Sequence, residues 1–174
     1  MDFSLDIDQL CTFNVMLTIS FGLAVVWYIS LDIFKKYIYN SLEKKDWWHS
    51  NALSPTKSMM SNFGYPKCPT DKFPDGVTEE MARDFYAALI AICSSHFICA
   101  LPMLPILVYG WENSPDSYKI MFILGTLGDV GFDIYDFAQN TVRCFKKGVA
   151  LPIPIETWVI VCLMHHTTAL ALVS

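Results

Sequence analysis

The chain has 174 residues, of which 53% are hydrophobic and only 17% are charged, and its mean hydropathy is +0.37. Soluble domains carry about 25% charged residues, so this composition excludes both a disordered chain and an ordinary soluble domain. The formal net charge is −5, without a basic stripe. This excludes a nucleic-acid partner, because phosphates require clustered Lys and Arg. The composition therefore predicts a polytopic membrane protein.

Four apolar stretches predict four membrane-spanning helices. Residues 11–31 and 85–111 carry no charge and exceed the roughly 20 residues that a spanning helix needs. The third stretch, from Ile120 to about Val142, contains acids and can span only if protein or water shelters them. The fourth, residues 157–174, just reaches the necessary length. None alternates apolar and polar residues as membrane strands do, so we expect an all-α fold.

The connections between these stretches differ in their basic residues. The N-terminal segment, residues 1–10, is acidic and has no Lys or Arg, and the three following connections have eight, one and three. This alternation is typical of the positive-inside rule. It predicts that the long first connection faces the cytosol and that both termini lie in the lumen or exterior. Together with the apolar stretches, this gives a first transmembrane helix with its extension over residues 11–40 and a polar cytosolic loop over residues 41–82.

Local signals divide the long loop. Phe63-Gly64 and Asp75-Gly76 predict turns. Thr78-Glu79-Glu80 predicts the start of the second spanning helix. The pair Trp47-Trp48 suggests an anchor at the membrane interface, where tryptophan is enriched.

The third stretch carries Asp129, Asp133 and Asp136 at positions i, i+4 and i+7. On a helix this spacing places the three on one face, and glycines recurring every third residue allow a neighbouring helix to approach closely. A carboxylate in hydrocarbon costs at least about 2.5–3.5 kcal/mol, so the acids must meet protein, water or protons. Two interpretations stay open: a polar cavity among the helices, or a helix end in water at the interface.

Histidines fall inside the other stretches. His96 lies well within the second, and His165 and His166 lie near the middle of the fourth. A carboxylate beside an imidazole orients the ring and stabilises its cation, which suits general acid–base chemistry. A zinc site of three histidines and one carboxylate and a proton path lined by the acids stay open as alternatives.

The order of these motifs resembles the TLC domain family. That family has a serine-histidine helix, then a helix with a Gly-aromatic-x-x-x-Asp signal, then a paired-histidine helix. The resemblance covers about residues 83–170, and the matching residues are Ser95-His96, Gly131-Phe132 with Asp136, and His165-His166.

The resemblance implies a bundle of membrane helices that handles lipids. The family includes ceramide synthases, which transfer an acyl group from acyl-CoA to a sphingoid base, and members tied to lipid sensing. By resemblance, His165 or His166 acts as general base, with Asp136 or Asp133 in support and His96 as the third candidate. The resemblance further implies acyl-CoA as co-substrate with no bound cofactor or metal, membrane lipid as partner, and a place in the endoplasmic reticulum or another endomembrane.

The chain ends eight residues after His166, whereas the synthases continue with further helices. We therefore expect residues 83–174 to form an incomplete TLC-like bundle with three transmembrane helices. A partner chain or a second copy would cover its Asp/His face. The alternative function is a non-enzymatic structural or lipid-binding subunit of a larger membrane complex.

Overall fold

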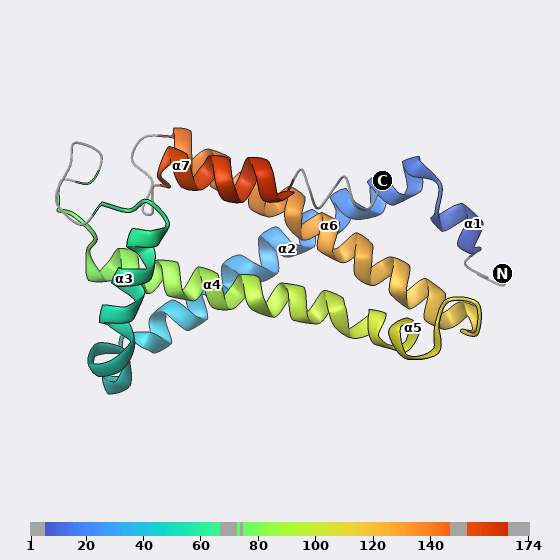
Figure 1. The fold of residues 1–174 in the computed structure, drawn as a ribbon, viewed down its shortest axis with the longest axis horizontal. Helices are drawn as coiled ribbons and strands as arrows, with labels where there is room; N and C mark the ends of the chain where they lie inside the picture. Colours follow the sequence, from blue (N-terminus) through green and yellow to red (C-terminus); the bar gives the residue numbers. More distant parts are fainter. Residues whose placement is uncertain (1–5, 67–72, 74, 147–152, 167–174) are drawn as a thin grey trace. The chain divides into compact units, whose positions relative to one another are not determined.

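The computed structural model describes residues 6–66, 73, 75–146 and 153–166. Every regular element in these ranges is a helix (Figure 1), which confirms the all-α prediction. In chain order the elements are α1 (Ile7–Leu10), α2 (Phe13–Leu42), the π-helical η1 (Trp48–Ala52), α3 (Leu53–Asn62), α4 (Glu79–Ala100), the 3-10 turn η2 (Leu101–Met103), α5 (Leu104–Tyr109), α6 (Asp116–Phe145), α7 (Ile155–Thr157) and the π-helical η3 (Trp158–His166).

Local sequence signals account for several element ends. Helix α4 begins at Glu79 as predicted, and the Thr78 hydroxyl accepts a hydrogen bond from the Met81 backbone amide at 3.2 Å. This satisfies one of the amides that a helix start leaves without a partner. Gly64 and Gly76 have positive φ angles of 78° and 66°, a conformation that glycine adopts without strain. The two predicted turns are therefore confirmed.

The predicted loop over residues 41–82 is more ordered than expected. Helix α2 continues to Leu42, and η1 and α3 follow within the loop. Trp48 is completely buried, with its ring centroid 5.3 Å from that of Tyr86, whereas Trp47 is 44% exposed. The predicted interfacial anchor is therefore wrong for Trp48, because this side chain forms the core beneath α3 and α4.

Two helical stretches are long and apolar enough to cross a membrane. They are Phe13–Leu42 and Glu79–Tyr109, whose most apolar 18-residue segments have mean hydropathies of 1.8 and 2.0. Helix α6 has the length, at 30 residues, but its acids interrupt the apolar run. The predicted fourth span, residues 157–174, is described only as far as His166, and its last eight residues lie outside the described residues. Within the described ranges, two of the four predicted spans thus have the required character.

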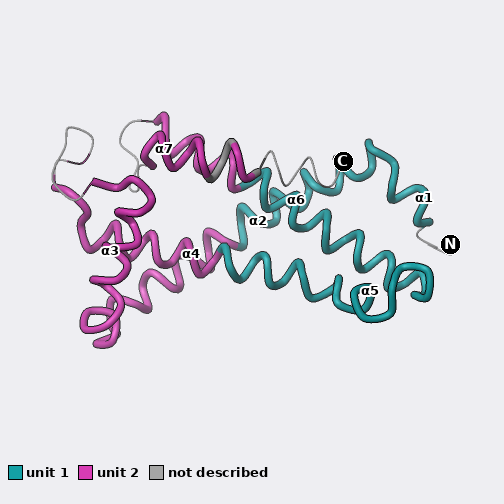
Figure 2. Tube along the Cα trace, viewed as in Figure 1, with its two compact units in different colours: residues 1–30, 92–135 teal, residues 31–91, 136–174 magenta. Residues whose placement is uncertain are grey.

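The chain divides into two compact units (Figure 2). Unit 1 comprises residues 1–30 and 92–135, and unit 2 comprises residues 31–91 and 136–174. Helices α2, α4 and α6 each contribute residues to both units.

Glycines of α6 permit close helix packing in unit 1. A Cβ at Gly125 would lie 2.6 Å from the Cys99 carbonyl oxygen of α4, and one at Gly131 would lie 2.8 Å from an α2 carbonyl oxygen. Neither contact is sterically possible, so only glycine fits. The Trp27 indole of α2 donates to the Gly128 carbonyl oxygen at 2.8 Å. The predicted small stripe therefore packs against two neighbouring helices.

Unit 2 has its own apolar core. Trp48 and Met60 are fully buried there, and Tyr65 is only 3% exposed. The Tyr65 ring packs against the rings of Phe73 and Phe85 at centroid distances of 5.7 and 6.1 Å. This core packs the region of η1 and α3 against the start of α4, and it therefore holds the first turns of α4 in place.

Candidate functional site

A histidine–aspartate pair connects two helices of unit 1. Helix α4 carries His96 and α6 carries Asp129, and the His96 Nδ1 lies 2.7 Å from the Asp129 Oδ1. The Phe132 ring packs edge-on against the imidazole, with a centroid distance of 4.8 Å. Close packing of the two helices, which the α6 glycines allow, brings the two polar side chains within hydrogen-bond reach.

This geometry has a definite chemical meaning. An ionised carboxylate only accepts hydrogen bonds, so it holds the proton of the imidazole on Nδ1 and leaves Nε2 as an acceptor. The side chains of His96 and Asp129 are 41% and 44% exposed, so a bound molecule can reach them. The pair can therefore accept a proton from a nucleophile and stabilise the resulting imidazolium.

The other predicted site residues differ in their burial. Asp133 and Asp136 are buried, with 4% and 9% exposure, and the Asn140 side-chain amide donates to the Asp136 Oδ2 at 2.8 Å. His165 is exposed on η3. His166 ends η3, and its side chain lies outside the described residues.

One predicted site residue contacts the acidic face of α6. His96, the third candidate by sequence, contacts an acid of the predicted face. That acid is Asp129.

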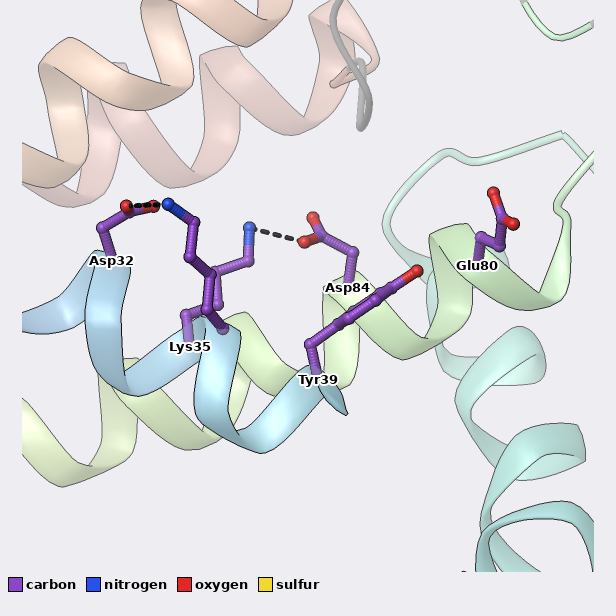
Figure 3. Close-up of a pocket in the computed structure, with 6 residues that line it drawn as sticks. Asp32, Lys35, Tyr39, Glu80 and Asp84 are labelled. Atoms are coloured by element: carbon purple, nitrogen blue, oxygen red, sulfur yellow. Dashed lines mark hydrogen bonds and ion pairs between the residues drawn. The ribbon is translucent and has the colours of Figure 1, made fainter. Parts of the chain in front are cut away.

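A pocket of about 230 Å³ lies in unit 2 (Figure 3). This pocket was not predicted from the sequence, because Lys35 and Lys36 indicated only how the chain is oriented in the membrane. Four of its residues occupy positions i, i+3, i+4 and i+7 of α2, which places them on one helix face. The lining residues are Asp32, Lys35, Lys36 and Tyr39 of α2, and Glu80 and Asp84 of α4.

Two ion pairs of different exposure occupy this pocket. The Lys35 Nζ lies 2.7 Å from the Asp84 Oδ1, and these side chains are 19% and 21% exposed. Asp84 also faces Arg143 of α6, with 3.8 Å between its Oδ2 and the Nη2. The outer pair joins the Lys36 Nζ and the Asp32 Oδ2 at 2.7 Å, with exposures of 72% and 54%. The inner pair is therefore held by several partners and largely shielded from water, whereas the outer pair is largely exposed.

Arg83 fixes one wall of the pocket. Its Nη2 donates to the Tyr39 hydroxyl at 3.1 Å, and its guanidinium lies 4.3 Å from the centre of the same ring. Its Nη1 lies 3.5 Å from the Glu43 Oε2. The Arg83 side chain is only 8% exposed, so this buried guanidinium holds the Tyr39 ring in a fixed orientation.

Among the described residues, no group of three or more His, Cys, Asp or Glu side chains is arranged so that it could hold a metal ion. No protein-family model, no curated protein and no solved structure matches this chain. Its function must therefore be argued from the chemistry of its own side chains.

Proposed function

We propose that this chain is a TLC-like, lipid-handling membrane protein with four spanning helices, and that it transfers an acyl group from acyl-CoA to a lipid amine of the sphingoid type. The contact between His96 and Asp129 carries this proposal. His96 lies twelve residues beyond Asp84, the last charge before the second apolar stretch. At about 1.5 Å per residue, this places His96 about 18 Å into a hydrocarbon layer of about 30 Å. An imidazole–carboxylate pair at that depth is costly, and a proton-transfer role explains its presence.

In the proposed reaction the amine nitrogen attacks the thioester carbonyl carbon, and the carbon–sulfur bond breaks. His96 Nε2 takes the proton that the nitrogen loses and delivers it to the departing thiolate. Asp129 keeps the Nδ1 proton in place and stabilises the imidazolium between these two transfers. The products are an amide and free coenzyme A.

The remaining predicted residues offer a second arrangement within the same proposal. In it, His165 or His166 is the base, and Asp133 or Asp136 supports it. The two arrangements predict different mutational patterns, so one set of variants distinguishes them.

The test uses the full chain in proteoliposomes supplied with acyl-CoA and a long-chain amine. We expect His96→Ala and Asp129→Asn to lower the rate of amide formation by about 10²–10⁴-fold, the range for a lost general base. His49→Ala is the control, because this exposed histidine of η1 belongs to unit 2 and pairs with Glu79 at 3.3 Å, whereas the proposed base belongs to unit 1. A loss confined to His165→Ala or His166→Ala would assign the base to the paired histidines instead.

A non-enzymatic function is the second candidate, and the exposed apolar side chains favour it. Helix α2 exposes 72% of Phe13 and 70% of Tyr37, and α5 exposes 71% of Leu107 and 74% of Val108. A structural or lipid-binding subunit would cover such faces with lipid, a partner chain or a second copy. Absence of amide formation, together with a stable complex after detergent extraction, would support this candidate over the enzyme.

A further inference from the structure

The pocket of unit 2 lies where two apolar stretches end. Asp32 is the first charged residue after the uncharged residues 11–31, and Asp84 is the last before the uncharged residues 85–111. Both line the pocket (Figure 3). If α2 and α4 cross the membrane as in the proposed function, both enter the hydrocarbon next to this pocket. The pocket then lies at the level of the phospholipid headgroups.

The charges of the pocket select a ligand that carries both signs. Its lining contains the ammonium groups of Lys35 and Lys36 and the carboxylates of Asp32, Glu80 and Asp84. A purely anionic ligand meets more carboxylates than ammonium groups, and a purely cationic ligand meets both lysines. A ligand with one negative and one positive group finds a partner for each.

We propose that this pocket binds the zwitterionic headgroup of a phospholipid, with its phosphodiester at Lys36 and its ammonium at Asp32. The inference rests on the membrane embedding in the proposed function. Both binding groups come from α2, and α4 completes the lining with Glu80 and Asp84.

Exchange of the outer ion pair makes this binding feasible. The Lys36–Asp32 pair is largely exposed, and exposed pairs contribute little stability because water screens them. The phosphodiester replaces Asp32 as the partner of Lys36, and the ammonium replaces Lys36 as the partner of Asp32. Lys36 and Asp32 therefore each keep a group of opposite charge as a partner.

The rest of the pocket needs no rearrangement. The Lys35–Asp84 pair, which Arg143 supports, keeps its contacts beneath the exchanged pair. Tyr39, held by Arg83, gives the headgroup a fixed wall. The ligand therefore binds a preformed surface, which lowers the entropic cost of association.

Titration of the full chain in an uncharged detergent tests this inference. The probe is a short-chain phosphatidylcholine kept below its critical micelle concentration, with its affinity measured by calorimetry. Lys36→Met and Asp32→Asn should each weaken binding by about tenfold, which corresponds to one lost charged contact. Lys44→Met is the matched control, because Lys44 is an exposed lysine that does not line the pocket. Its affinity should equal that of the unaltered chain.

Three further ligands identify the chemistry that is recognised. Inorganic phosphate and choline alone should each bind much more weakly than the phosphatidylcholine, and the short-chain phosphatidylglycerol should bind more weakly as well. Tighter binding of phosphatidylglycerol, or equal binding of inorganic phosphate, would overturn the inference in favour of a simple anion site. Unchanged affinity in Lys36→Met would also overturn it. Helicity measured by circular dichroism confirms that each variant is folded.

Failure of this inference differs from failure of the proposed function. The titration measures binding of a soluble probe and requires neither a bilayer nor turnover. Loss of headgroup binding with intact amide formation refutes the pocket assignment alone. Headgroup binding without amide formation refutes the enzyme and leaves the pocket assignment in place.

Discussion

Replacement of Gly125 by alanine tests the close packing of α6 against α4 in unit 1. The new Cβ would lie 2.6 Å from the Cys99 carbonyl oxygen and 3.1 Å from the Met103 Cγ. An ordinary carbon–oxygen contact is about 3.3–3.6 Å, so the carbonyl must retreat by roughly 0.7 Å. Met103 can rotate away, but the carbonyl belongs to the backbone of α4 and can move only with its helix.

The expected cost follows from two opposing terms. Overpacking of a close interface costs about 1–3 kcal/mol, whereas alanine in place of a helical glycine favours the helix by about 0.5–1 kcal/mol. Gly22→Ala provides the second term alone, because Gly22 lies inside α2 with nothing within 4 Å of an added Cβ. The difference between the two variants therefore isolates the packing term, which we expect to be about 1–3 kcal/mol.

The assay is reversible unfolding of the full chain in one detergent, followed by circular dichroism. Gly125→Ala should unfold more readily than the unaltered chain, and Gly22→Ala should be at least as stable as the unaltered chain. Equal stability of the two variants would refute the reasoning, because it would mean that α4 and α6 do not approach as closely as described.

Three further substitutions have definite expected outcomes. Trp27→Phe removes an indole hydrogen bond of 2.8 Å to an α6 carbonyl oxygen and should lower the free energy of unfolding by about 0.5–1.5 kcal/mol in the same assay. Burial raises the pKa of the Tyr65 phenol, so the stability that its neutral form contributes is present below the unfolded-state pKa of about 10 and is lost as the pH rises above it. Tyr65→Phe should therefore unfold at higher pH than the unaltered chain in an alkaline titration. Asp84→Asn removes the charge that faces both Lys35 and Arg143 and should lower the free energy of unfolding by about 1 kcal/mol, measured by detergent denaturation; no change would mean that the pair is fully screened.

Features set by neighbouring residues were predictable from the sequence. The start of α4 follows from a threonine before two glutamates, and the turns at Gly64 and Gly76 follow from the backbone freedom of glycine. The small face of α6 follows from glycines at every third position. In each case the physical cause lies within one or two helical turns of its effect.

Features that join distant segments were not predictable in this way. The pocket brings Asp32 of α2 together with Asp84 of α4, and neither segment alone indicates the other. Trp48 looked like an interfacial residue because it stands in a polar stretch, yet α3 and α4 bury it completely. Burial of that ring depends on the path of the whole loop, which residue types in the loop do not encode by themselves.

The His96–Asp129 contact shows how a local pattern becomes a site through helix register. Spacing placed three acids on one face of α6, but the acid that meets His96 depends on how α4 lies along that helix. The position of Cys99 defines this register, because a Cβ added at Gly125 or at Gly128 would lie against an atom of Cys99. His96 is three residues before Cys99, and Asp129 is four residues after Gly125, so in an antiparallel pair the two lie opposite each other.

The Gly125→Ala variant should also disturb this contact. Hydrogen bonds weaken beyond about 3.2 Å, and the His96–Asp129 distance is 2.7 Å. The roughly 0.7 Å retreat of α4 that the variant imposes would lengthen this hydrogen bond past that limit. The variant should therefore lose amide formation along with stability, which would link the glycine face of α6 directly to the proposed proton transfer.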